Sequence, residues 1–231
     1  MSHPADLHLY WFPGSCARVP LVALEEIGAP FELTVPRRPS DEYAAVNPKG
    51  KVPALVADGR VITENPAIQA FLARSFPEAR LLPEQPEAAL EALSTMCWFA
   101  SGIHPVVGRL RFPASVSPLP ESHDGVRAAA LGQLEKEFAI AEERLADREW
   151  LFGEWTIVDA YLLWCWFRAV GLGIDASRFP RCAEHGRQCE QRDSVARALE
   201  REEAEFARLV DAGVVPEFLQ VPWQAGRLPV S

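Results

Sequence analysis

The 231-residue sequence is poor in cysteine, in positive charge and in long apolar runs. Its five cysteines form no CxxC pair and no Cys/His cluster at metal-ligand spacing, which argues against a disulfide framework or a structural zinc. With 32 acidic and 23 basic side chains, the net charge of −9 disfavours binding to nucleic acid. No segment approaches the roughly 20 apolar residues that cross a bilayer, and no signal peptide is apparent. We therefore expect a cytoplasmic protein with reduced thiols and no metal, whose partners are small molecules or proteins and not membranes.

The first third of the sequence alternates between strand-like and helix-like segments. Residues 17–28 place apolar side chains at helical spacing between two strand-like runs and stop at Gly28. Asp58-Gly59 is typical of a tight hairpin turn. The predicted elements are strand 7–11, helix 17–28, strand 31–35, a short helix or turn 41–51, strands 52–57 and 60–63, and helix 65–76. This order is βαβ followed by ββα.

The rest of the sequence is predicted to be helical. The stretch 77–88 carries three prolines and is the best candidate for a linker. Thr156, followed three residues later by Asp159, has the spacing of a capping box in front of a helix that is apolar on nearly all sides. The predicted helices are 87–112, 124–147, 153–171 and 194–213.

Five short motifs, YWFPGSCA, NPKGKVPALV, ITENPAIQAFLA, SGIHPVV and WLFGEWTIVDAYLL, occur in an order and spacing that resemble the soluble glutathione transferases over about residues 7–210. PGSC together with His104 looks most like the bacterial beta class, and the zeta class is the next nearest. The resemblance implies an α/β thioredoxin-like N-terminal domain in residues 1–80 and a linker in 81–86. It also implies an all-α helical domain in 87–231, including a C-terminal tail.

Cys16 and Ser15 are the first candidate catalytic residues. A thiol at a helix N-terminus can have a lowered pKa, and the thiolate is its reactive form. In the beta class the matching cysteine can form a mixed disulfide with glutathione, which would favour thiol exchange. Ser15 could instead donate a hydrogen bond to the glutathione thiolate. A third interpretation makes Cys16 a small packed residue without a role.

The resemblance also implies the residues that bind glutathione. Pro53 would be in the cis form and would turn the backbone of Val52 toward the cysteinyl part of glutathione. Glu64 and Asn65 would receive its γ-glutamyl end at a helix N-terminus, although the family usually has Ser or Thr in place of Asn65. Asn65 could equally be a plain helix N-cap. Lys51 could attract a glutathione carboxylate or be a solvated lysine.

His104 is the third catalytic candidate, because histidine is suited to proton transfer near neutral pH and the beta class has one at this place. A lone histidine on an apolar helix face is more often a core residue. Pro105 follows it and should disturb the helix, since proline cannot bond to the carbonyl of Ser101. Cys97 occupies the position at which the beta class has an asparagine near glutathione.

Trp11, Phe12 and Phe112 are candidate walls of a pocket for the second substrate, although aromatic residues more often belong to the core. Arg109 and Arg111 follow His104 by one and two turns, and could select an anionic substrate or be solvated. Tyr161 and the tryptophans of 153–171 are assigned to the core.

Three functions follow from these residues. The first is a glutathione-dependent transferase or thiol-exchange enzyme that acts on a small electrophile or a mixed disulfide, with glutathione as co-substrate and no metal. The second is a non-catalytic binding protein on the same fold, favoured by Asn65, Pro105 and Cys97. The third is a zeta-type isomerase that uses Ser15. The family also implies a homodimer and a role in detoxification.

Overall fold

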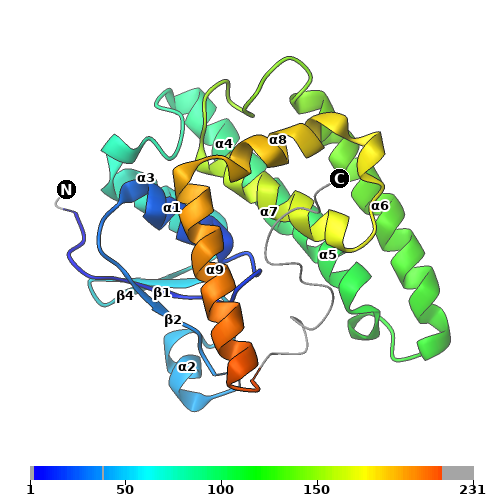
Figure 1. Cartoon of the computed structure of the whole chain (residues 1–231), viewed down its shortest axis with the longest axis horizontal. Coiled ribbons are helices and arrows are strands. Elements are labelled where there is room, and N and C mark those ends of the chain that lie inside the picture. Colours follow the sequence, from blue (N-terminus) through cyan, green and yellow to red (C-terminus); the bar gives the residue numbers. More distant parts are fainter. Residues whose placement is uncertain (1–2, 38, 215–231) are drawn as a thin grey trace.

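The computed structural model describes residues 3–37 and 39–214, in which a small sheet with helices is followed by a larger helical part (Figure 1). The elements are β1 (Leu7–Tyr10), α1 (Arg18–Ile27), β2 (Glu32–Thr34), α2 (Asp41–Val46), β3 (Ala54–Ala57), β4 (Arg60–Thr63), α3 (Asn65–Ser75), α4 (Pro86–Trp98), α5 (His104–Arg111), α6 (His123–Arg144), α7 (Ile157–Gly171), α8 (Pro180–Glu190) and α9 (Asp193–Asp211). The predicted fold class is confirmed, and the tail beyond residue 214 lies outside the described residues.

The four strands form one mixed sheet in the order β2-β1-β3-β4. β1 pairs in parallel with β2 and antiparallel with β3, and β3 pairs antiparallel with β4. Leu9 and Leu55 are register partners on β1 and β3, and both are fully buried. Because β1 and β3 run in opposite directions, the loop that leaves β1 lies beside the loop that enters β3. This arrangement brings residues 11–17 next to Val52-Pro53.

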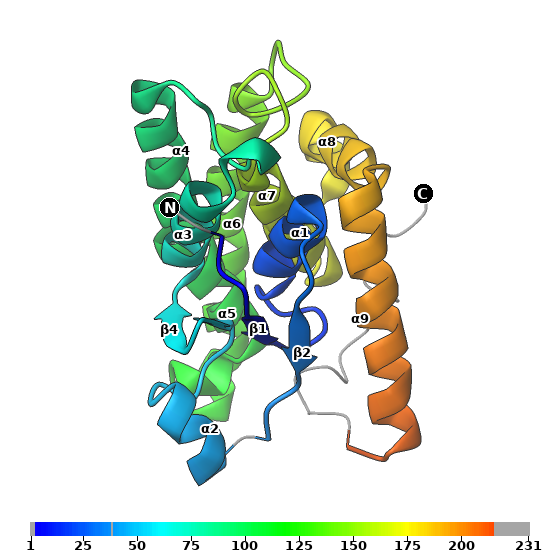
Figure 2. The same ribbon diagram turned by 90° about the vertical axis from the view of Figure 1, so that its left-hand side faces the viewer.

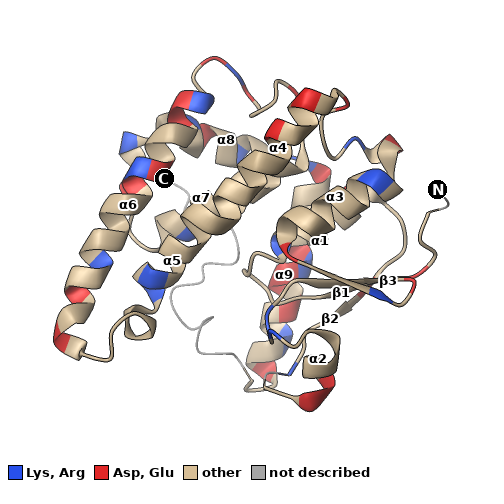
Figure 3. Cartoon of the chain, turned by 180° about the vertical axis from the view of Figure 1, so that it is seen from behind, with Lys and Arg blue, Asp and Glu red and all other residues tan. Residues whose placement is uncertain are grey.

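Helix α1 joins the sheet to the helical part, since it packs against α3, α7 and α9 (Figure 2). Arg18 at its start donates to both carboxylate oxygens of Glu202 on α9, over distances of 2.6 to 3.2 Å. Neither side chain is more than 1% exposed. Charged residues are otherwise spread over the surfaces of both parts (Figure 3). The last described helix is thus fixed to the start of α1, directly after the loop formed by residues 11–17, here called the site loop.

Helix α7 is buried along almost its whole length, and its start is fixed as predicted. The backbone N–H of Thr156 donates to Asp159 Oδ2 at 2.9 Å, which is one half of the predicted capping box. Asp159 Oδ1 also accepts from the backbone N–H of Leu151 at 2.9 Å and lies 3.0 Å from His185 Nε2. This carboxylate therefore connects α7 to the preceding loop and to α8.

Helix α8 was not predicted. The single helix predicted over 87–112 is two α-helices, α4 and α5, separated by a π-helical segment. The buried residues Cys182, His185 and Cys189 of α8 recur at helical spacing. The domain boundaries stay predictions. The proposed linker, residues 81–86, begins with a residue that is packed against the helical part. Leu81 is 1% exposed, and its carbonyl accepts from the backbone N–H of Ile157 at 2.9 Å. Within residues 3–37 and 39–214, no helix has the length and apolar character needed to cross a membrane.

Candidate functional site

A cleft between the sheet and the helical part consists of two adjoining cavities of about 360 and 380 Å³. Both cavities are lined by Cys16, Lys51, Val52, His104 and Gly108. The first, here the sheet lobe, adds Asn47, Lys49, Pro53, Glu64, Asn65 and Tyr161. The second, here the helix lobe, adds Gly14, Ser15, Arg111, Phe112, Trp164 and Arg168. The described part of the chain has no group of His, Cys, Asp and Glu suited to hold a metal ion.

Cys16 lies at the junction of the two lobes, on the turn before α1. Its side chain is 8% exposed, and its Sγ lies 3.7 Å from the carbonyl oxygen of Val52. Burial, with a smaller contribution from the charge of Glu64, raises the pKa of Cys16 to about 12. The expectation that the helix N-terminus lowers this pKa is therefore wrong, because desolvation of the thiolate outweighs the hydrogen bonds that favour it.

Ser15 lines the helix lobe, but its hydroxyl is used to hold the turn. Its Oγ donates to the carbonyl of Phe12 at 2.7 Å and accepts from the backbone N–H of Ala17 at 3.2 Å. A hydroxyl has only one hydrogen to donate. Ser15 would have to leave Phe12 before it could donate to a thiolate.

The loop that enters β3 has the predicted cis peptide bond between Val52 and Pro53. The carbonyl of Lys51 accepts two hydrogen bonds of 2.6 Å, from Tyr43 Oη and from Asn47 Nδ2. These bonds fix the backbone immediately before Val52. The loop is therefore held by Tyr43 of α2 and by Asn47, which directly follows α2.

Glu64 and Asn65 lie at the N-terminus of α3, as expected, but Asn65 is not the N-cap. Glu64 is the N-cap of α3 and has a φ of +72°, a region that L-residues rarely occupy and that is concentrated at functional sites. Asn65 is the first helical residue and is not the N-cap. Its Nδ2 donates to the carbonyl of Cys16 at 2.9 Å, while its buried Oδ1 has no hydrogen-bond partner. Lys49 forms an ion pair with Glu64 and donates to Thr63 Oγ1 at 3.0 Å.

His104 begins α5 and lines both lobes. The disturbance expected from Pro105 takes the form of a π-helical segment, Phe99–Ile103, after which the His104 N–H bonds to the Phe99 carbonyl. The imidazole meets the Trp164 ring edge-on, with centroids 4.6 Å apart. Burial, with smaller contributions from the charges of Arg168 and Lys51, lowers the pKa of His104 to about 4. His104 is therefore neutral at neutral pH.

Three of the predicted pocket residues lie outside the cleft. Trp11 is 2% exposed and lines a separate groove beside α9, because its backbone still pairs with β2. Phe12 is buried, and its carbonyl accepts from the hydroxyl of Ser15 at 2.7 Å. Arg109 reaches toward Gln133 on α6, with 3.5 Å between Nη1 and Oε1. Phe112 does line the helix lobe.

Several residues of the cleft were assigned to the core or not singled out at all. Tyr161, Trp164 and Arg168 of α7 share one helix face and contribute to both lobes. That face is hidden in the sequence because α7 is apolar on nearly all sides. Asn47 and Lys49 belong to the quoted motif NPKGKVPALV, whose polar residues were the signal available for the sheet lobe.

Comparisons with known proteins agree on one family. Residues 14–75 match the model described as glutathione S-transferase, N-terminal domain. Glutathione S-transferase GstA of Escherichia coli O157:H7 is 32% identical over 182 residues, which cover 73% of this chain and 86% of that protein. A glutathione S-transferase of a sphingomonad, complexed with glutathione, is 29% identical with a TM-score of 0.75, and 84% of this chain covers 98% of it. The beta class glutathione S-transferase of Sphingomonas chungbukensis is 31% identical with a TM-score of 0.74, over 84% and 98% of the two chains.

Proposed function

This chain belongs to the glutathione S-transferase family, and we propose that its cleft conjugates glutathione to a small electrophile. The predicted enzyme class, its beta-like character and glutathione as co-substrate are confirmed. One observation carries the proposal for the individual residues. Cys16, Val52 and the neutral His104 line both lobes, so that one substrate in each lobe would meet beside them.

The chemistry of the sheet lobe fits glutathione. Glu64 offers a carboxylate to the ammonium group of the γ-glutamyl end, and Lys49 and Lys51 offer positive charge to its carboxylates. The unpartnered Oδ1 of Asn65 is an acceptor that lacks a donor. Val52 would pair through its backbone with the cysteinyl part, as an added strand does.

The proposed reaction transfers the glutathione sulfur to carbon. The thiol loses its proton to the neutral imidazole of His104, and the proton then passes to solvent. The thiolate forms a bond to the electrophilic carbon, and the leaving group departs with the electrons of the bond that breaks. Cys16 remains protonated, because a thiol with a pKa of about 12 is almost entirely un-ionised at neutral pH. Its S–H is directed at the carbonyl of Val52 and would turn from that oxygen to donate to the glutathione sulfur.

This assignment separates conjugation from thiol exchange. Exchange needs the Cys16 thiolate, so its rate should rise about tenfold per pH unit up to about pH 12. We expect little adduct on Cys16 after incubation with oxidised glutathione at pH 7, as measured by intact-protein mass. Cys16→Ala should retain conjugation at a reduced rate. A Cys16 adduct that forms rapidly at pH 7, with all turnover lost in Cys16→Ala, would instead support thiol exchange.

The same samples test the other two functions. Reduced glutathione should raise the melting temperature, since a ligand that binds only the folded state stabilises it. A protein that glutathione does not stabilise and that forms no conjugate would be a binding protein on this fold. The zeta-type isomerase requires Ser15, so turnover that is abolished in Ser15→Ala but kept in Cys16→Ala would support it.

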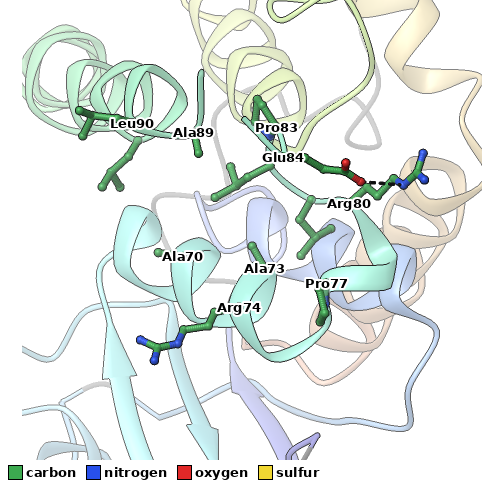
Figure 4. Close-up of a pocket in the computed structure, with 12 residues that line it drawn as sticks. Ala70, Ala73, Arg74, Pro77, Arg80, Pro83, Glu84, Ala89 and Leu90 are labelled. Carbon is green, nitrogen blue, oxygen red and sulfur yellow. Dashed lines mark ion pairs between the residues drawn. The ribbon is translucent and has the colours of Figure 1, made fainter. Parts of the chain in front are cut away.

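We also propose a cytoplasmic homodimer with a role in detoxification. All five cysteines are free, which suits a reducing compartment. A groove of about 430 Å³ between α3 and α4 is lined mainly by apolar side chains, including Leu90, Leu93 and Ala73 (Figure 4). Leu90 is 68% exposed at its edge. Arg74 and Glu84 place both signs of charge around the groove, as a two-fold interface between identical chains requires.

The groove is tested by oligomeric state. Leu90→Glu should shift the protein from dimer to monomer in size-exclusion chromatography with light scattering. Leu119→Glu is the matched control, because Leu119 is also exposed but lies far from the groove in sequence and does not line it. A wild-type monomer, or a dimer that survives Leu90→Glu, would contradict this interface.

A further inference from the structure

Two arginines of the helix lobe have no counter-ion among the described residues. Arg111 on α5 and Arg168 on α7 line the lobe. Neither forms an ion pair with a described residue or donates a hydrogen bond to one. The Nε and Nη2 atoms of Arg111 are buried and unpartnered. A buried guanidinium nitrogen without an acceptor is costly, so native proteins usually provide one.

The described residues that line the helix lobe carry only positive charge. Lys51 is the third cation among them, and none of them is Asp or Glu. Figure 3 shows Lys or Arg at the end of α5 and also on α7. Burial and the charge of Arg111 lower the pKa of Arg168 to about 9, which indicates that the two guanidiniums oppose each other. Arg18 also lowers the pKa of Arg168, and its ion-pair partner Glu202 offsets part of this effect.

We propose that the second substrate is an electrophile that carries a carboxylate, and that Arg111 and Arg168 bind this group in the helix lobe. The inference rests on the proposed function, in which glutathione occupies the sheet lobe. It adds the chemical class of the other substrate and the two residues that select it.

A carboxylate fits this lobe better than a neutral group does. The guanidinium presents parallel N–H donors that match the two carboxylate oxygens, and such charge-assisted bonds are short and strong. One carboxylate would supply an acceptor to the orphaned nitrogens and reduce the repulsion between the arginines. Phe112 and Trp164 provide aromatic surface for the organic body of the substrate.

A matched pair of probes isolates this preference. In 4-chloro-3-nitrobenzoate and 4-chloro-3-nitrobenzamide the ring and the leaving group are the same, and only the carboxylate is replaced by a neutral amide. In both, the glutathione thiolate bonds to the ring carbon that carries chlorine, chloride leaves with the bonding electrons, and the thiol proton goes to solvent. Each enzymatic rate is divided by the uncatalysed rate, because the two substituents activate the ring differently.

The wild-type enzyme should favour the benzoate over the benzamide by roughly tenfold or more in corrected kcat/KM, since a hydrogen bond to a charged group contributes at least that factor. Arg111→Gln and Arg168→Gln should each remove most of this preference through KM for the benzoate. The KM for glutathione should stay unchanged.

Arg109→Gln is the matched control, because it removes the same charge from the same helix but lies outside the lobe. It should keep the preference. Equal corrected rates for the two probes in wild type would overturn the proposal. It would also be overturned if the arginine variants raised the KM for glutathione by the same factor with either probe as second substrate. The latter result would assign the arginines to glutathione.

A binding measurement keeps the inference separate from the proposed function. Isothermal titration calorimetry with 3-nitrobenzoate and 3-nitrobenzamide, which lack the leaving group, should show tighter binding of the benzoate that is lost in the Arg111→Gln/Arg168→Gln double variant. Arginine-dependent binding without conjugation of either chlorinated probe would uphold the anion site and defeat conjugation. Benzoate that binds no better than the benzamide would defeat the anion site, even in an enzyme that turns over.

Discussion

Two arginine guanidiniums lie against the ring of Phe167 in very different surroundings. Arg18, with its Cζ 4.3 Å from the ring centroid, is bound by both oxygens of Glu202 and is sealed inside the protein. Arg168, at 5.9 Å, lines the helix lobe and has no carboxylate partner among the described residues. The same kind of charge is thus matched on one side of α7 and unmatched on the other.

The comparison separates a structural charge from one that is available to a ligand. A buried ion pair contributes little net stability, but removal of one partner leaves an uncompensated charge that is strongly destabilising. Arg18 and Glu202 therefore fix α1 to α9. Arg168 is only partly buried, so its unmatched charge is less costly than that of Arg18 would be without Glu202, but its lowered pKa beside a cavity is typical of functional sites.

The largest expected effect comes from making Arg18 unmatched. Glu202→Leu should lower the free energy of unfolding by about 3–5 kcal/mol, because it leaves the Arg18 charge buried without a partner. Urea denaturation followed by circular dichroism measures this change. Glu200→Gln, an exposed change on the same helix, should have almost no effect. The Arg18→Met/Glu202→Leu double variant should recover much of the loss, and an additive loss in that variant would contradict the assignment.

His104 tests whether the unmatched charges also act on the chemistry. His104→Gln should lower kcat/KM by about 100-fold, at the low end for a general base, because a base with a pKa of about 4 is weak. The neutral imidazole is the active form and is lost as pH falls through about 4. The ratio of wild-type to variant activity should therefore stay constant from pH 7.5 to 5 and decrease only below that range. A ratio that collapses near pH 6.5 would show an unperturbed histidine.

The smallest effect should have the opposite sign in stability. Arg168 has a lowered pKa in the folded state, so its charge costs stability at neutral pH, and this cost fades as pH rises from about 9 toward 12.5. Arg168→Met should therefore raise the free energy of unfolding by about 1 kcal/mol at pH 7. Arg18→Met, the same change at the matched arginine, should lower it. If both variants changed the free energy of unfolding in the same direction, the distinction between the matched Arg18 and the unmatched Arg168 would be contradicted.

Arg168→Met should also raise the pKa of His104, because the Arg168 charge is one of the causes that lower it. The relevant ratio is now the activity of Arg168→Met divided by that of Arg168→Met/His104→Gln. The pH at which this ratio declines should move upward from about 4. An unchanged pH dependence would mean that burial alone keeps His104 neutral.

The sequence was most informative where local patterns decide the structure. The alternation of strands and helices and the Thr156 and Asp159 cap were predicted from short motifs, and the cis Val52-Pro53 bond was implied by the family resemblance. The balance of burial and charge could not be predicted, because it depends on segments far apart in the chain. The raised pKa of Cys16 is the clearest case, since sequence places it at a helix start but cannot show how deeply the thiol is buried.

The prediction of the residues that line the pocket was incomplete for a related reason. Arg109 and Arg111 differ by two positions, which on a helix turns the side chains by about 200°, and only the packing of α5 decides which one reaches the cleft. Trp164 and Arg168 lie in a helix that is apolar all round, so periodicity cannot identify the face that meets a substrate.

The pair of Arg18 and Glu202 also sets an order for assembly of the new chain on the ribosome. The two residues are 184 positions apart, so Arg18 has no counter-ion until nearly the whole polypeptide has been synthesised. Domains generally fold as units during synthesis, and the N-terminal domain emerges first. Here the thioredoxin-like domain emerges with an uncompensated cation at the start of α1, and this cation gains its partner only when α9 arrives. A chain that stops before residue 202 therefore lacks the partner that anchors α1, even though it contains every residue of the cleft.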